Sequence, residues 1–193
     1  MNPQMRVAPA LGALIGLLLW ASPAAADQDP RWRWRTIETE HFRVHFPRGL
    51  DEIARRLAAT AEETHTRMVD DLGWEPRRIT HWVLVDDTDY AQGLTWVGPN
   101  NVIRIWAASP GDMDELEDYD DPLRWVITHE YTHLVHIDQA RGLPALINAI
   151  FGHIYHPSHL APRWLLEGYA IHQESSLSTG GRVRGSMFDM FLR

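Results

Sequence analysis

The chain has 193 residues, the length of one globular domain, and 45% of them are apolar, which supports a packed core and argues against disorder. Its formal net charge of −8 argues against a nucleic-acid-binding surface, which needs clustered positive charge. It has 11 histidines and no cysteine, so disulfides are excluded and any metal site must use His and carboxylate ligands.

The N-terminal segment has the layout of a secretory signal peptide, which we expect to comprise residues 1–26. Arg6 gives the positive start, residues 8–20 are almost wholly apolar, and small residues up to Ala26 form an A-x-A cleavage pattern. Cleavage there predicts an exported, periplasmic or secreted protein. The mature domain over 27–193 has a formal charge of −9, because the removed segment holds one Arg and no acid. The alternative is a retained anchor, although the apolar run is short for a membrane-spanning helix.

The hydrophobic periodicity predicts strands first and helices later. The expected elements are two strands within 35–46, a helix over 50–72 ended by Gly73, strands over 79–85 and 101–107, and helices over 122–138, 145–152 and 163–173. This order predicts an α+β fold with a mixed or antiparallel sheet rather than a doubly wound one.

An acidic run separates the last expected strand from the next helix. Seven acidic residues lie between positions 111 and 121, and their spacing does not follow the EF-hand order of ligands. A solvated loop is therefore favoured over a calcium loop. Asp121 followed by Pro122 is a suitable N-cap and first-turn pair for the helix over 122–138.

The pattern His-Glu-x-x-His lies on this predicted helix. His129 and His133 are four residues apart, so they lie one turn apart on one face and can bind the same Zn²⁺. Glu130 is rotated about a quarter-turn from them, which suits a general base that takes a proton from zinc-bound water. Apolar neighbours on both sides indicate a buried helix, where two His and a Glu need a metal or a hydrogen-bond network. The alternative is two unrelated His on an ordinary helix.

A catalytic zinc site needs three protein ligands and an open position for water. A metzincin-type continuation fails, because position 136 is His rather than Gly and position 139 is Gln. Downstream, residues 163–170 read Arg-Trp-Leu-Leu-Glu-Gly-Tyr-Ala. With His-Glu-x-x-His about thirty residues upstream, this segment resembles the gluzincin metallopeptidases, whose third ligand is a Glu on a downstream helix. The resemblance implies that Glu167 is the third ligand and that the chain binds one zinc ion.

The mature chain as a whole is similar to peptidase-MA-like domains of exported bacterial proteins, which often continue into a TolB-like β-propeller. Residues 128–138, 164–170 and 181–193 carry the similarity, and the last of these runs without a gap to the end of the chain. The similarity implies a small mixed or antiparallel sheet followed by an active-site helix and a third-ligand helix. It also implies a domain truncated at its C-terminal end, with a propeller downstream in a full-length protein.

The resemblance further implies a substrate-binding edge strand beside the active-site helix. The strand over 101–107 is the candidate, because it could pair with a peptide backbone by strand addition. The alternative role is that of an ordinary sheet strand.

Other polar residues near the motif have two open interpretations each. His136 is either a support for the site or a partly exposed His one turn beyond it, and Asp138 either orients a ligand His or caps the helix. Glu174 falls seven residues after Glu167 and can support the site. Thermolysin-like enzymes have a supporting Asp four after the Glu ligand, where this chain has Ile171.

A second His cluster follows the motif. His153, His156 and His159 surround Pro157, which favours a loop over the site rather than a second metal. An oxyanion stabiliser is also required. The candidates are Tyr155, His156, Tyr169 and His172, and the sequence does not choose among them.

Three functions follow from these patterns. The first is zinc-dependent hydrolysis of peptide or protein substrates, with Glu130 as general base. The second is a zinc-stabilised binding module that cuts nothing, since fold does not fix function. The third is metal storage or sensing by the His-rich region, which predicts several metal ions per chain.

Overall fold

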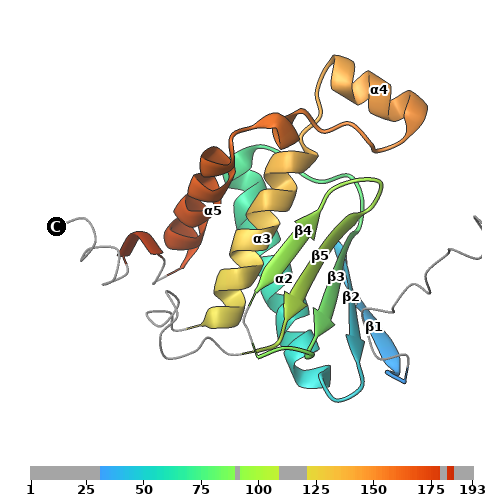
Figure 1. Cartoon of the computed structure of the whole chain (residues 1–193), viewed down its shortest axis with the longest axis vertical. Coiled ribbons are helices and arrows are strands. Elements are labelled where there is room, and N and C mark those ends of the chain that lie inside the picture. The colour runs from blue at the N-terminus through green and yellow to red at the C-terminus, as the bar shows by residue number, and fades with distance from the viewer. Residues whose placement is uncertain (1–30, 90–91, 109–120, 179–181, 185–193) are drawn as a thin grey trace, which may run out of the picture. The chain divides into compact units, whose positions relative to one another are not determined.

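The computed structural model describes residues 31–89, 92–108, 121–178 and 182–184. The chain divides into two compact units, Met1–Trp32 and Arg33–Arg193, and the fold below is that of the second unit. The predicted signal peptide and most of the acidic run lie outside the described residues. Figure 1 shows the elements in chain order. They are β1 (Trp34–Glu38), β2 (Phe42–Pro47), α2 (Asp51–Leu72), β3 (Thr80–Val85), β4 (Gly93–Trp96), β5 (Asn101–Trp106), α3 (Pro122–Asp138), α4 (Leu143–Phe151), the 3-10 turn η2 (Pro157–Leu160), α5 (Arg163–Leu177) and the 3-10 turn η3 (Arg182–Arg184).

The fold is α+β with a mixed sheet of five strands, as the element order predicts. The strand order is β1-β2-β3-β5-β4. The central pairs β2–β3 and β3–β5 are parallel, whereas β1–β2 and β4–β5 are antiparallel. Helix α2 provides the crossover between the parallel strands β2 and β3, which a hairpin cannot connect.

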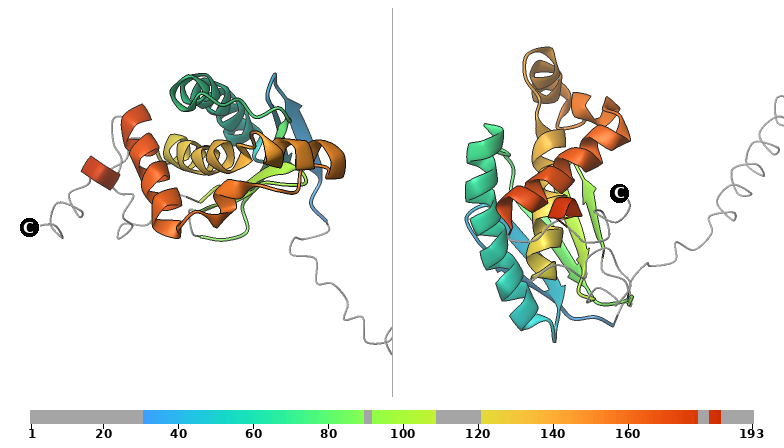
Figure 2. Two further views of the ribbon diagram at one scale, coloured as in Figure 1. Left: turned by 90° about the horizontal axis from the view of Figure 1, so that it is seen from above. Right: turned by 90° about the vertical axis from the view of Figure 1, so that its left-hand side faces the viewer.

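The helices α2 and α3 cover one face of this sheet (Figures 1 and 2), and the core lies between them and the strands. Alternate residues of the central strands point into it, among them Phe42, Trp82 and Ile103, which are fully buried. Leu57 of α2 and Leu134 of α3 face them and are also fully buried. Each such side chain contributes roughly 1.5–3 kcal/mol of transfer free energy, so this layer fixes where α3 lies.

Local sequence signals set the helix ends. Gly73 adopts a left-handed conformation with φ of 58° and ends α2, while the side chain of Asp121 accepts a hydrogen bond from the backbone N–H of Arg124 at the start of α3. Both ends were predicted. Helix α4 begins two residues earlier than expected, and α5 continues four residues further.

The prediction for the strand over 101–107 is correct as to the strand and wrong as to the edge. β5 lies between β3 and β4, so both of its sides are already paired. The edge strands of the described sheet are β1 and β4. The sequence did not predict β4, which packs against α3. No helix in the described part of the chain has the length and apolar character needed to cross a membrane.

Candidate metal centre

Two histidines on adjacent turns of α3 bring their ring nitrogens together. The Nε2 atoms of His129 and His133 are 3.1 Å apart, and the two rings meet edge to face with centroids 4.7 Å apart. The helix packs against α2, α5, β4 and β5, so His129 is only 6% exposed and His133 is largely covered. The predicted helical spacing therefore produces a convergent pair.

Glu167 completes a three-residue group with these histidines. Its Oε2 atom is 3.5 Å from the Nε2 atoms of both His129 and His133. It lies on α5, which packs beside α3 (Figure 1), and on this helix Ala170 is buried and Leu166 is partly buried. Residues far apart in the sequence are thus held by the contact between two helices.

The three ligand atoms fit the dimensions of a tetrahedral zinc site. Zinc bound at 2.0–2.2 Å by His and carboxylate ligands requires those ligand atoms to be about 3.3–3.6 Å apart. The distances in this group are 3.1, 3.5 and 3.5 Å. Shifts of a few tenths of an ångström in the side chains would accommodate the ion.

Glu174 fixes the orientation of His129. Its Oε2 atom lies 2.9 Å from His129 Nδ1 and accepts a hydrogen bond from Trp125 Nε1 at 2.6 Å. When Nδ1 carries the proton and donates to this carboxylate, Nε2 keeps its lone pair toward His133 and Glu167. The support predicted for Glu174 is therefore present in the contacts.

Electrostatics keep these ligands ready to bind a cation. Burial and the neighbouring His129 lower the pKa of His133 to about 4, so its imidazole is neutral at pH 7. Burial would raise the pKa of Glu174, but hydrogen bonds with His129 and Arg182 outweigh it and lower the pKa to about 2. Glu174 is therefore an anion and His133 a neutral imidazole, which are the states needed for a supporting carboxylate and for a metal ligand.

The strand β4 positions Glu130. Thr95 Oγ1 donates to Glu130 Oε2 at 2.7 Å and also contacts the Glu130 carbonyl oxygen at 3.1 Å. A Cβ on Gly93 would lie 2.6 Å from Glu130 Oε1 and would overlap Cγ, so only glycine leaves room for this carboxylate. Burial raises the pKa of Glu130, and the charge of Glu167 adds to the rise against the opposing effects of His129 and Thr95.

The residues beyond the motif separate into different environments. His136 meets Tyr169 edge to face with centroids 5.2 Å apart, and it does not belong to the ligand group. Asp138 does not orient a ligand His. It accepts from Trp74 Nε1 at 2.8 Å and lies 2.9 Å from His153 Nε2, so it ties the end of α3 to two other segments.

The second His cluster forms a loop rather than a metal site within the described residues. The rings of His153 and His156 meet edge to face at 4.3 Å, and His159 lies beyond them, but none belongs to a group of suitable metal ligands. His156 is buried, whereas Tyr155 and His172 are exposed. None of the four oxyanion candidates makes a contact with the ligand group that would select it.

Three residues of the site had no sequence signal. Gly93 and Thr95 lie on the unpredicted strand β4. Arg182 of η3 donates to Glu174 Oε1 at 3.0 Å, and its guanidinium lies 5.4 Å from the centre of the Trp125 ring. No motif spacing in the sequence assigns Arg182 to the site.

Comparisons of the chain with protein-family models, curated proteins and solved structures gave no match.

Proposed function

We propose that this chain is a gluzincin-type zinc metallopeptidase domain of an exported protein. The observation that carries the proposal is the triangle of His129 Nε2, His133 Nε2 and Glu167 Oε2, whose sides of 3.1, 3.5 and 3.5 Å suit one zinc ion. Three protein ligands leave a fourth position open, as a catalytic site requires. The signal-like segment over 1–26 supports export to the periplasm or beyond.

Zinc bound by these residues would polarise the scissile carbonyl and lower the pKa of water. The remaining chemistry belongs to Glu130, whose carboxylate accepts a proton from the attacking water. The water oxygen bonds to the carbonyl carbon, the C–N bond breaks, and Glu130 returns the proton to the leaving amine.

The strand β4 offers a place for an extended substrate. One side of β4 pairs with β5, and no other strand pairs with it in the described part of the chain. A peptide added along the free side would run past Thr95, whose hydroxyl contacts Glu130. Leu94 and Trp96 are 46% and 45% exposed beside it and can contact substrate side chains.

The decisive experiment compares two substitutions on adjacent turns of α3. Glu130→Gln keeps the shape of the side chain and an oxygen for Thr95, so the group of His129, His133 and Glu167 should still bind zinc while cleavage of a peptide library falls to background. His133→Ala should lose both zinc at this site and cleavage. Mass spectrometry of the library and titration of metal-free protein with Zn²⁺ provide the two measurements.

Two outcomes would contradict the proposal. Full cleavage by Glu130→Gln would remove Glu130 from the mechanism. Zinc binding by the wild type without cleavage of any peptide would instead support a zinc-stabilised binding module.

A further inference from the structure

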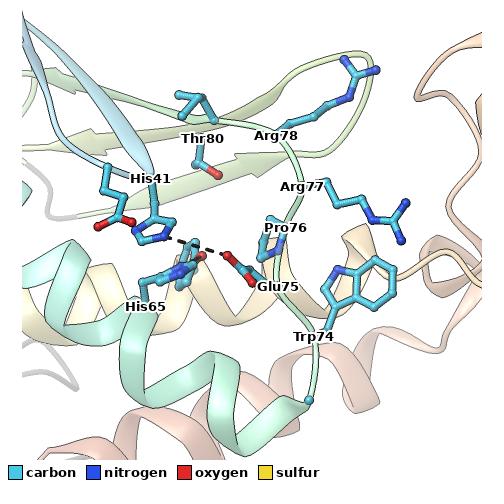
Figure 3. Close-up of a pocket in the computed structure, with 12 residues that line it drawn as sticks. His41, His65, Trp74, Glu75, Pro76, Arg77, Arg78 and Thr80 are labelled. Atoms are coloured by element: carbon cyan, nitrogen blue, oxygen red, sulfur yellow. Dashed lines mark hydrogen bonds and ion pairs between the residues drawn. The ribbon is translucent and has the colours of Figure 1, made fainter.

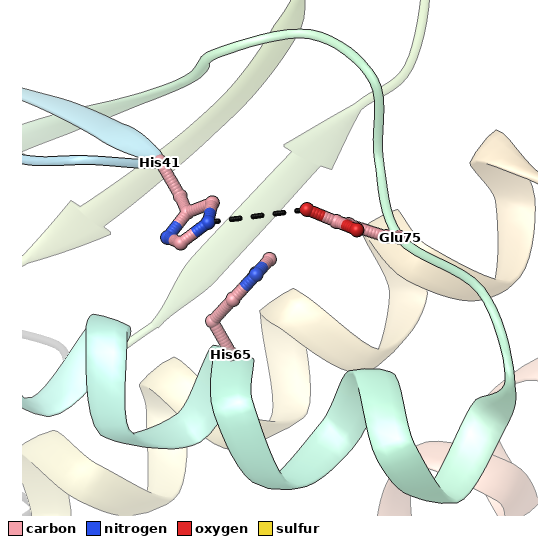
Figure 4. A group of neighbouring side chains, drawn as sticks. All are labelled: His41, His65 and Glu75. Atoms are coloured by element: carbon pink, nitrogen blue, oxygen red, sulfur yellow. Dashed lines mark ion pairs between the residues drawn. The ribbon is translucent and has the colours of Figure 1, made fainter.

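A second group of potential metal ligands lies away from the site described above. It consists of His41, His65 and Glu75, each of which offers one ligand atom within 4.8 Å of the other two (Figure 4). His41 lies in the turn before β2, His65 on α2, and Glu75 in the segment between α2 and β3. The group lines a cavity of about 570 Å³ (Figure 3).

The ring of His41 is held by a carboxylate, but it stacks on the ring of His65 with centroids 3.8 Å apart and ring planes 22° apart. One of the two rings must turn before both Nε2 atoms can face one ion. The Nδ1 atom of His41 lies 2.7 Å from Glu62 Oε2, and its backbone N–H donates to the other oxygen of the same carboxylate. A proton on Nδ1 leaves the lone pair on Nε2, which faces Glu75 Oε1 at 3.9 Å (Figure 4). This carboxylate–histidine pairing is the usual support of a metal-bound imidazole.

The second imidazole is held by a residue of α3. His65 is 5% exposed, and its Nδ1 atom lies 2.6 Å from the hydroxyl of Tyr131, which is itself buried. This contact leaves Nε2 as the nitrogen available for a further ligand. Burial lowers the pKa of His65 and the nearby His41 adds to the effect, so the imidazole is neutral at pH 7.

The charges around the group favour a cation. Glu75 supplies one carboxylate, and Glu62 supplies another behind His41. Arg77 and Arg78 also line the cavity, but their side chains point away from the two imidazoles (Figure 3). Two imidazoles and one carboxylate form a donor set suited to borderline divalent ions such as Zn²⁺.

We propose that His41, His65 and Glu75 form a second, structural site for a divalent transition-metal ion of the Zn²⁺ class. The ion would connect the β1–β2 turn, α2 and the α2–β3 segment, which approach each other only through the fold. The distance of 3.9 Å between His41 Nε2 and Glu75 Oε1 must shorten by about half an ångström to match zinc. Because the side chain of Glu75 is 62% exposed, it can move that far without disturbing the core. The proposal is independent of peptidase activity and raises the expected zinc count from one to two.

The test removes the first site and then measures the second. The full chain carrying His133→Ala is freed of metal and titrated with Zn²⁺ by calorimetry, and it should still bind about one ion, whereas the wild type binds two. Adding Glu75→Gln should weaken binding of the remaining ion at least tenfold. The matched control is Glu40→Gln, which removes the same charge from the lining of the same cavity but no ligand.

Thermal unfolding keeps the result interpretable. In EDTA, the Glu75→Gln and Glu40→Gln proteins should unfold at the same temperature, which shows that both are folded. With His133→Ala present in both proteins, added Zn²⁺ should raise the Tm of the Glu40→Gln protein and leave that of the Glu75→Gln protein nearly unchanged. A single zinc in the wild type with none in His133→Ala, or equal zinc binding by the two Glu variants, would overturn the proposal.

Discussion

The two His–His–Glu groups use the same side chains but hold them on different kinds of structure. His129, His133 and Glu167 lie on two packed helices, and their ligand atoms are already 3.1–3.5 Å apart. His41 and Glu75 lie in connecting segments, and His41 Nε2 is 3.9 Å from Glu75 Oε1. A helix fixes the position of a ligand atom through its backbone and its packing, whereas a loop residue keeps conformational freedom that is lost when the metal binds.

The supporting carboxylates differ in the same way. Glu174 behind His129 is fully buried, while the side chain of Glu62 behind His41 is 27% exposed. A buried carboxylate holds its partner more strongly, because water does not compete for the hydrogen bond. We therefore expect tight zinc binding at the first group and weaker binding at the second.

The largest expected difference concerns the carboxylate ligands themselves. Glu167→Gln should weaken zinc binding at the first group at least a hundredfold, since it removes a ligand, whereas supporting residues typically account for about 10- to 100-fold. Calorimetric titration, compared with Glu75→Gln at the second group, provides the measurement. Arg163→Gln is the control, because Arg163 lies 3.7 Å from Glu167 Oε1 but is 91% exposed and should change little. An equal loss from Glu167→Gln and Glu75→Gln would remove the proposed difference between helix and loop.

The next effect separates positioning of Glu130 from metal binding. Gly93→Ala would place a methyl group against the Glu130 carboxylate, and a displacement of about 1 Å can cost on the order of a hundredfold in rate. Peptide cleavage should fall by that order, while both zinc affinities stay within about twofold of the wild type. Gly168→Ala is the matched control, because a Cβ there meets nothing within 4 Å although the residue adjoins Glu167. Unchanged cleavage by Gly93→Ala would show that β4 does not position the base.

The sequence predicted His129, His133 and most of the fold because those signals are local, whereas Glu167 followed only from the resemblance to gluzincins. A spacing of four residues on a helix places His129 beside His133, and Asp121 with Gly73 marks two helix ends. The second group had no such pattern, since its ligands come from three segments that meet only when α2 packs on the sheet. The strand β4 was missed because it has four residues and begins with Gly, so its alternation is too short to recognise.

Acid stability gives a third and smaller difference between the groups. The pKa of Glu174 lies near 2, below its ordinary value of 4.5, so this carboxylate stabilises the fold fully above pH 4.5 and loses that effect as pH falls toward 2. In EDTA, the free energy of unfolding should fall by about 3 kcal/mol more in the wild type than in Glu174→Gln between pH 5 and pH 2. Chemical denaturation at several pH values measures it. In Glu62→Gln, the fall in the free energy of unfolding between pH 5 and pH 2 should stay closer to that of the wild type, because Glu62 is partly exposed. An equal fall in Glu62→Gln and Glu174→Gln would contradict the difference in burial.

The smallest effect tests whether the two groups act separately although α3 serves both. Tyr131 follows Glu130 directly in the sequence, yet its hydroxyl contacts His65 of the second group at 2.6 Å. Tyr131→Phe should weaken zinc binding at the second group about tenfold. It should also lower the free energy of unfolding by about 1–3 kcal/mol, because the buried imidazole of His65 loses its partner. The zinc affinity of the first group and the rate of peptide cleavage should remain within about twofold of the wild type, since Thr95 of β4 holds Glu130. Titration and cleavage of one preparation measure both, and a loss at the first group equal to that at the second would show that α3 couples them.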